Sequence, residues 1–216
     1  MTVHSKYANS FAPVKYFLSS YRALCDGRSG VQQLEEKIET ANLLLSDWKV
    51  NWIGACSILR VAIDLLKIDA KSCLKQEIKD EISKEWMNIK KNREEHAIFW
   101  QFLKKERDSI IHGYEWQAYE AWMKPDGTFR GPLSLLAMND DGARPVLRMR
   151  GGFFEGHNSL DLLKESADWV EERIMSAIRR AGYDPEESRG LLNFELPPKT
   201  TESLLGGFQY NNKIEK

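Results

Sequence analysis

The stretch "NWIGACSILRVAIDLLKI", residues 51–68, decides the fold because it is apolar almost all round. On a helical wheel of about 100° per residue it presents two adjacent apolar faces. One face carries Ile58, Val61, Leu65 and Ile68, and the other carries Leu59, Ala62, Ile63 and Leu66. Such a helix is typical of the centre of a bundle, where it contacts several partners.

The segments around this helix have amphipathic patterns. Apolar residues recur three or four positions apart over 31–52, and about a helical turn apart between 69 and 93. A fourth helical segment runs from about Glu94 to beyond Trp116. Four consecutive helices with short connections predict a mainly α, antiparallel four-helix bundle over residues 31–122.

The periodicity changes after Met123. Gly, Pro and Asp are frequent over 124–156, where two extended segments, 129–138 and 145–154, flank the turn signal "NDDG". This pattern predicts an inserted β-hairpin.

Residues 158–182 return to helical spacing and predict an additional C-terminal helix that packs on the bundle. Ser159 is its expected N-cap and Gly182 its expected stop. The ends lack a sustained period, so we expect an N-terminal arm (1–28), a single domain (29–183) and a C-terminal tail (184–216).

Composition restricts the function classes. The chain has 216 residues, of which 42% are hydrophobic and 29% charged, which suits one domain with a sizeable core. A formal net charge of -1 argues against a protein that coats phosphates with its whole surface, but it allows a local basic cleft. With no signal peptide and no membrane-spanning run, we expect a cytoplasmic protein without a membrane partner.

Familiar metal and cofactor motifs are missing from the sequence. The three cysteines are widely spaced, the four histidines are far apart, and no His-Glu-x-x-His occurs. The glycine-rich stretches lack the Lys-Ser/Thr ending of a phosphate loop, and there is no Gly-x-Ser-x-Gly elbow. The sequence therefore predicts neither a metal nor a cofactor.

One short motif, "RDSIIH" from Arg107 to His112, carries chemistry. Phe99, Leu103, Ile110 and Tyr114 form an apolar stripe on the predicted helix. Arg107 falls at the edge of this stripe, where a guanidinium costs several kcal/mol unless it is paired or faces a groove. The alternative is a structural role for Arg107, in which its aliphatic part covers apolar surface and its guanidinium pairs with a Glu of a neighbouring helix.

An arginine with a histidine suits phosphodiester cleavage of RNA. Histidine moves a proton near neutral pH because its reference pKa is about 6.5, and a guanidinium holds the phosphate and its developing charge. Asp108 is four residues before His112, a spacing at which a carboxylate can orient an imidazole. One helix supplies only one imidazole, so a two-fold dimer would provide the second.

These residues resemble the HEPN superfamily, whose members carry Arg-x4-6-His with a polar residue often following the arginine. The resemblance covers roughly residues 31–122. It implies a helical bundle that dimerises through the motif-bearing fourth helix, and a metal-independent endoribonuclease used in toxin–antitoxin, phage-defence or CRISPR-linked systems. By this resemblance, His112 is the general acid or base, Arg107 binds phosphate, and Asp108 orients one of them. An antitoxin protein is then a further expected partner.

RNA-binding candidates lie beside the motif. Lys104 and Lys105 are suited to guide a phosphate backbone, and Tyr114 and Trp116 to stack on bases, although core packing is the more common role for an aromatic such as Tyr114. Two alternatives stay open. One is a non-catalytic module that binds RNA, a nucleotide or a protein partner, and the other is a structural dimer.

Overall fold

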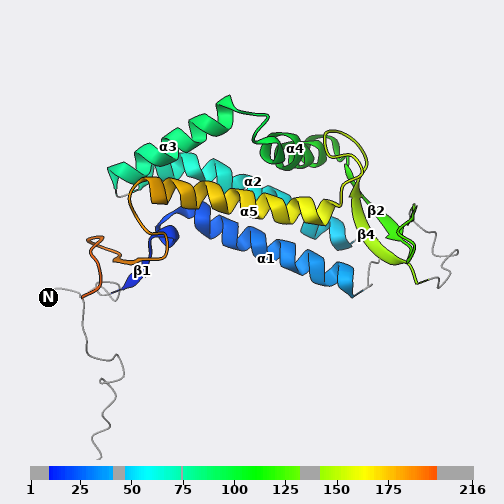
Figure 1. The fold of residues 1–216 in the computed structure, drawn as a ribbon, viewed down its shortest axis with the longest axis horizontal. Coiled ribbons are helices and arrows are strands. Elements are labelled where there is room, and N and C mark those ends of the chain that lie inside the picture. Colours follow the sequence, from blue (N-terminus) through cyan, green and yellow to red (C-terminus); the bar gives the residue numbers. More distant parts are fainter. Residues whose placement is uncertain (1–9, 41–46, 74, 132–141, 199–216) are drawn as a thin grey trace, which may run out of the picture.

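Helix α2 (Asp47–Ser72) lies at the centre of the fold and packs against helices α1, α3, α4 and α5. The computed structural model describes residues 10–40, 47–73, 75–131 and 142–198. This part of the chain is mainly helical, with two small antiparallel sheets (Figure 1). The other helices are α1 (Ser19–Glu39), α3 (Gln76–Lys91), α4 (Lys104–Gly113) and α5 (Ser159–Arg180). A central α2 confirms the prediction from its apolar sequence.

Helices α1 and α2 form an antiparallel pair (Figure 1). A Cβ on Gly27 would meet Leu59, and a Cβ on Gly30 would meet Ala55. The two helices therefore run in opposite directions and are packed closely at these glycines. Since α1 ends at Glu39 and α2 begins at Asp47, the single helix predicted over 31–52 is wrong. Both helices turn their apolar stripes to one core, which makes the period look continuous in sequence. Residues 41–46 lie outside the described residues.

The N-terminal segment is part of the body of the fold. Strand β1 (Phe11–Pro13), the 3-10 helix η1 (Val14–Phe17) and the start of α1 occupy residues assigned to an arm, so that boundary is wrong. Asp69 of α2 accepts hydrogen bonds at 2.9 Å from the backbone N–H groups of both Ser19 and Ser20. The N-terminus of α1 is thus capped by another helix, a contact that local sequence does not reveal.

A three-stranded sheet replaces the expected hairpin. Strand β2 (Ala118–Met123) lies between β3 (Phe129–Arg130) and β4 (Arg144–Met149), and both pairings are antiparallel. The predicted pairing of 129–138 with 145–154 is therefore wrong over the described residues, and positions 132–141 lie outside them. The fourth helix is also shorter than predicted, because α4 ends at Gly113 and β2 occupies its expected continuation.

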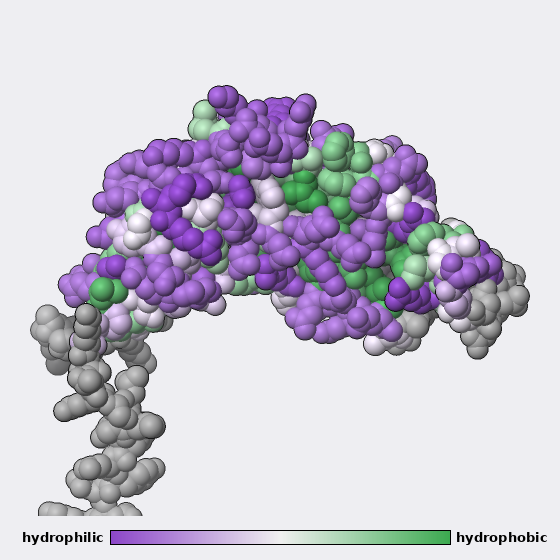
Figure 2. Space-filling view, in the orientation of Figure 1, coloured by the Kyte–Doolittle hydropathy of each residue, from purple (hydrophilic) through white to green (hydrophobic). Residues whose placement is uncertain are grey.

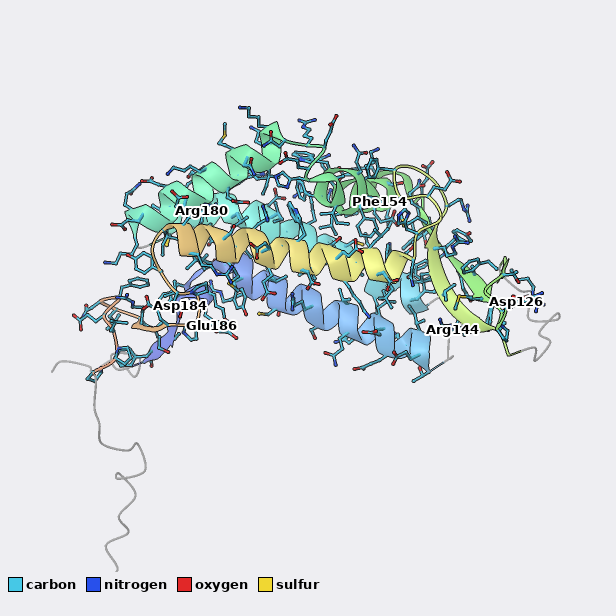
Figure 3. The ribbon with its side chains drawn as sticks, viewed as in Figure 1. Asp126, Arg144, Phe154, Arg180, Asp184 and Glu186 are labelled. Carbon is cyan, nitrogen blue, oxygen red and sulfur yellow. The ribbon has the colours of Figure 1, made fainter. Side chains whose placement is uncertain are left out.

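Helix α5 packs back on the helical body, as predicted. Its N-cap is Asn158, whose Oδ1 accepts from the backbone N–H of Leu160 at 2.9 Å, and not Ser159. Gly182 ends the helix in the left-handed region at φ 85°, as expected. Arg180 lies between α5 and α3 (Figure 3) and pairs with the buried carboxylate of Glu85.

The segment after α5 returns to the N-terminal end. Strand β5 (Ser188–Gly190) pairs antiparallel with β1, and Phe194 is buried against Phe17 and Tyr183. Residues 184–198 thus belong to the fold, which corrects the predicted tail, and 199–216 lie outside the described residues. All three cysteines are free.

The surface is mostly hydrophilic on the face shown in Figure 2, with apolar areas over its central part and towards the sheet. None of the described helices is both long and apolar enough to cross a membrane. Although α2 is central, Val61 and Ile68 are 46% and 53% exposed. One side of this apolar helix therefore faces outward.

Candidate functional site

Helix α4 is fixed to the core by a buried carboxylate. A π-helical segment, η2 (Ile98–Leu103), runs directly into α4, and Phe99, Leu103 and Ile110 are buried as predicted. Glu106 is 1% exposed, and its Oε1 accepts hydrogen bonds from Trp52 Nε1 at 2.9 Å and from the Ala118 backbone N–H at 3.3 Å. Burial raises the pKa of Glu106 against the effect of these bonds.

The next two residues pair with each other at the surface. Arg107 Nη1 donates to Asp108 Oδ1 at 2.9 Å, and Lys104 Nζ donates to Asp108 Oδ2 at 2.8 Å. Burial alone would raise the pKa of Asp108, but the bonds from Lys104 and Arg107 bring it below its ordinary value. The side chains of Arg107 and Asp108 remain 34% and 30% exposed. Arg107 thus pairs with its own neighbour and not with a Glu of another helix.

His112 is exposed in the last turn of α4, one turn beyond Asp108. Because both Asp108 oxygens accept from Lys104 and Arg107, the carboxylate holds the arginine of the motif. The imidazole is free to meet a ligand from solvent.

Helix α2 contributes further charges to this surface. Arg60 pairs with Asp64, and Lys67 Nζ lies 2.7 Å from Asp64 Oδ1. Burial and the nearby charge of Arg107 lower the pKa of Arg60, whereas the charge of Asp108 raises it. The charged groups of α2 and α4 therefore interact electrostatically. We call this set the charged cluster: Arg60, Asp64, Lys67, Lys104, Arg107 and Asp108. Four cations against two carboxylates make it locally positive.

The remaining candidates are Lys105 of α4 and two aromatic residues that follow this helix, Tyr114 and Trp116. Lys105 is exposed and lines a small cavity of about 290 Å³ with Ser109 and Gly151. Tyr114 is 77% exposed, so the prediction that it packs in the core is wrong. The helix has ended before it, and Tyr114 adopts a left-handed conformation with φ 52° and ψ 30°. Such strain in a bulky residue often accompanies a functional site.

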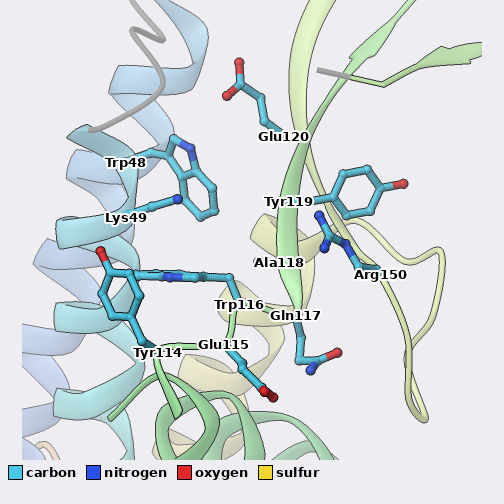
Figure 4. Close-up of a pocket in the computed structure, with 10 residues that line it drawn as sticks. All are labelled: Trp48, Lys49, Tyr114, Glu115, Trp116, Gln117, Ala118, Tyr119, Glu120 and Arg150. Carbon is cyan, nitrogen blue, oxygen red and sulfur yellow. The ribbon is translucent and has the colours of Figure 1, made fainter. Parts of the chain in front are cut away.

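Tyr114 and Trp116 line a groove of about 600 Å³, which we call the aromatic groove. In Figure 4, Trp48 and Lys49 extend from α2 on one side and Glu120 extends from β2 on the other. The Tyr119 ring lies on the other side of β2, where the Arg150 guanidinium is 5.6 Å from its centroid (Figure 4). The fold thus brings three separate segments to the end of the motif helix.

Two buried polar groups in the aromatic groove lack partners. Glu120 is 5% exposed, yet neither carboxylate oxygen makes a hydrogen bond, and Trp116 Nε1 is buried without an acceptor. Burial raises the pKa of Glu120, although the positive charge of Lys49 acts in the opposite direction and lowers it. Each buried polar group without a hydrogen-bond partner costs about 1–3 kcal/mol.

No protein-family model, curated protein or solved structure matches this chain. The HEPN resemblance therefore rests on Arg107, Asp108 and His112 and on the place of this motif in a series of helices. Among the described residues, no three His, Cys, Asp or Glu side chains gather closely enough to hold a metal ion.

Sequence reasoning missed several residues of this surface. Glu106 could have been found, because on a 100° wheel it falls about 20° from Phe99, at the edge of the apolar stripe opposite Arg107. A carboxylate in that position must find buried partners. Arg60, Lys49 and Glu120 left no comparable signal, since only the packing of α2 and β2 against α4 brings them to the site.

Proposed function

We propose that this protein is a metal-independent endoribonuclease of the HEPN type that acts as a homodimer. One observation carries the proposal: Arg107 and His112 both reach solvent on α4, and the arginine lies within a locally positive cluster. A guanidinium held by Asp108 is ready to bind a phosphate, and an exposed imidazole is ready to transfer a proton.

The chemistry divides between these side chains. Arg107 binds the non-bridging oxygens of the scissile phosphate and stabilises their charge as it develops. His112 takes the proton of the 2′-hydroxyl while the 2′-oxygen forms its bond to phosphorus. The bond from phosphorus to the 5′-oxygen breaks, and His112 of the second copy gives that oxygen a proton. The products are a 2′,3′-cyclic phosphate and a free 5′-hydroxyl.

Exposed apolar side chains support the dimer. Val61 and Ile68 on α2 flank the charged cluster, and Ile111 on α4 is 50% exposed next to His112. Apolar surface rimmed by charges commonly marks an interface between proteins. We expect Ile68→Lys to give a folded monomer with little cleavage activity, as measured by sedimentation and RNA degradation.

The decisive experiment incubates the purified protein with mixed RNA in EDTA. Wild type should release 2′,3′-cyclic phosphate ends, and Arg107→Ala and His112→Ala should each lose at least about 100-fold in rate. Matched controls are Arg93→Ala and His157→Ala, which change an exposed arginine and an exposed histidine outside the charged cluster. Equal activity of wild type and the motif variants, all folded, would exclude the proposal.

A second candidate is a non-catalytic module that binds RNA or a nucleotide. The aromatic groove with its unpartnered Glu120 favours this candidate, because a ligand could bind there without contacting His112. RNA binding without cleavage in the same experiment would support this candidate. The absence of both would leave a structural dimer.

A role in a toxin–antitoxin or phage-defence system is tested in cells. Expression of wild type, but not of His112→Ala, should arrest a bacterial host if the nuclease acts as a toxin. Relief by a co-expressed partner protein would identify the antitoxin.

A further inference from the structure

The aromatic groove has flat aromatic walls and contains both hydrogen-bond acceptors and a hydrogen-bond donor without partners. Trp48 and Trp116 meet edge to face, with ring centroids 6.0 Å apart, and Lys49 Nζ lies 5.2 Å from the Trp116 centroid. Glu120 offers two oxygen acceptors without donors, and Trp116 offers an N–H donor without an acceptor. A ligand that satisfies both must be able to accept and donate hydrogen bonds, and flat aromatic walls favour a planar ring.

The charge around the groove restricts the ligand further. Lys49 lines it with Nζ 5.2 Å from the Trp116 centroid, so an organic cation would meet repulsion even though tryptophans and a carboxylate are present. A ligand with an anionic group at the rim and a neutral ring inside fits this distribution better. A nucleotide has both features, because its phosphate is anionic and its base stacks on aromatic rings.

We propose that the aromatic groove is a base subsite that takes a guanine of the RNA. The two donors on its Watson–Crick edge, N1–H and the 2-amino group, match the two oxygens of Glu120. Adenine and cytosine present one amino group next to a ring nitrogen that is an acceptor. The lone pair of this nitrogen repels a carboxylate oxygen. Uracil has one N–H between two carbonyl oxygens, and these oxygens repel a carboxylate in the same way.

The position of the groove connects it to the motif. Tyr114, at the rim, is only two residues after His112, and Lys49 supplies a cation for a backbone phosphate. The inference rests on the proposed function in that it names the base bound beside the scissile phosphate. Base binding itself requires neither His112 nor cleavage.

The test measures binding of the pentanucleotides UUGUU, UUAUU, UUCUU and UUUUU to full-length His112→Ala protein in EDTA. UUGUU should bind at least about 10-fold more tightly than the others, the lower range for a good bidentate base contact. Adding Glu120→Gln should remove this preference while the affinity for UUUUU stays within about two-fold. Glu115→Gln is the matched control, because Glu115 also lines the groove but is exposed.

Trp116→Phe provides a second, independent variant. It keeps an aromatic ring for stacking and leaves Glu120 in place, so the preference for UUGUU should persist. Circular dichroism confirms that each variant is folded. Equal binding of all four pentanucleotides, or an unchanged preference in the Glu120→Gln protein, would overturn the inference. If wild type cleaves no RNA but the preference and its loss are observed, only the nuclease proposal fails.

Discussion

Arg107 Nη1 donates a hydrogen bond to Asp108 Oδ1 at 2.9 Å, so the two adjacent charged residues of the motif pair with each other. Lys104 completes the arrangement on the second oxygen. The carboxylate thus restrains a guanidinium that would otherwise move freely in solvent, and it does so without covering the exposed part of Arg107. Pre-organisation of this kind affects the reaction more than the fold.

Asp108→Asn should therefore slow RNA cleavage by about 10-fold, because Arg107 loses a charged partner and its orientation. The free energy of unfolding should change by less than about 1 kcal/mol, since the pair is partly exposed. Cleavage rates and urea titrations measure the two effects. Asp168→Asn, which removes a carboxylate that pairs with Arg28 on another surface, should leave cleavage unchanged. Equal rates for wild type and Asp108→Asn would show that Arg107 needs no restraint.

Glu106→Gln should alter the pH dependence of stability. Burial raises the pKa of Glu106 above its ordinary value of 4.5, so between these two values the folded state binds more protons than the unfolded state. The wild-type protein should therefore gain stability relative to Glu106→Gln as the pH falls from 7.5 towards 4.5. Urea titrations across this range measure the difference. A difference independent of pH would mean that Glu106 titrates as it does in the unfolded chain.

Tyr114→Gly should stabilise the fold and weaken RNA binding. A left-handed conformation costs a non-glycine residue about 1 kcal/mol, and glycine adopts it freely. The same change removes a ring that lines the aromatic groove and meets Trp116 edge to face. Thermal unfolding and RNA titration in the His112→Ala background measure the two effects. Tyr114→Phe keeps both ring and strain, and it should match its parent in both measurements.

The sequence was most informative where local pattern and packing agree. The apolar stretch of α2 and the period of α5 predicted helices that the structure contains, and the stop at Gly182 was correct because a left-handed residue favours glycine. The motif residues Arg107, Asp108 and His112 were found because they lie on one helix.

It was least informative where distant segments meet. Strand β2 was missed because its buried Glu120 and half-exposed Tyr119 reverse the usual order of polar and apolar faces. The cap of α1 by Asp69 and the groove formed by α2 and β2 depend on tertiary contacts that no short window contains. Such departures from local rules are common at functional sites.

Gly27 and Gly30 provide a matched test of the α1–α2 packing. Both lie within α1, where alanine is intrinsically more favourable than glycine by about 0.5–1 kcal/mol. A Cβ on Gly30 would lie 3.5 Å from Ala55 Cβ, an ordinary contact, so Gly30→Ala should stabilise the protein by about that amount.

A Cβ on Gly27 would instead lie 2.6 Å from Leu59 Cδ2, in a fully buried part of the core. Leu59 would have to move against close-packed neighbours, which costs about 1–3 kcal/mol and cancels the gain in helix propensity. Gly27→Ala should therefore be clearly less stable than Gly30→Ala in urea titrations. If both variants were stabilised equally, α1 and α2 would be farther apart at Gly27 than the structure has them.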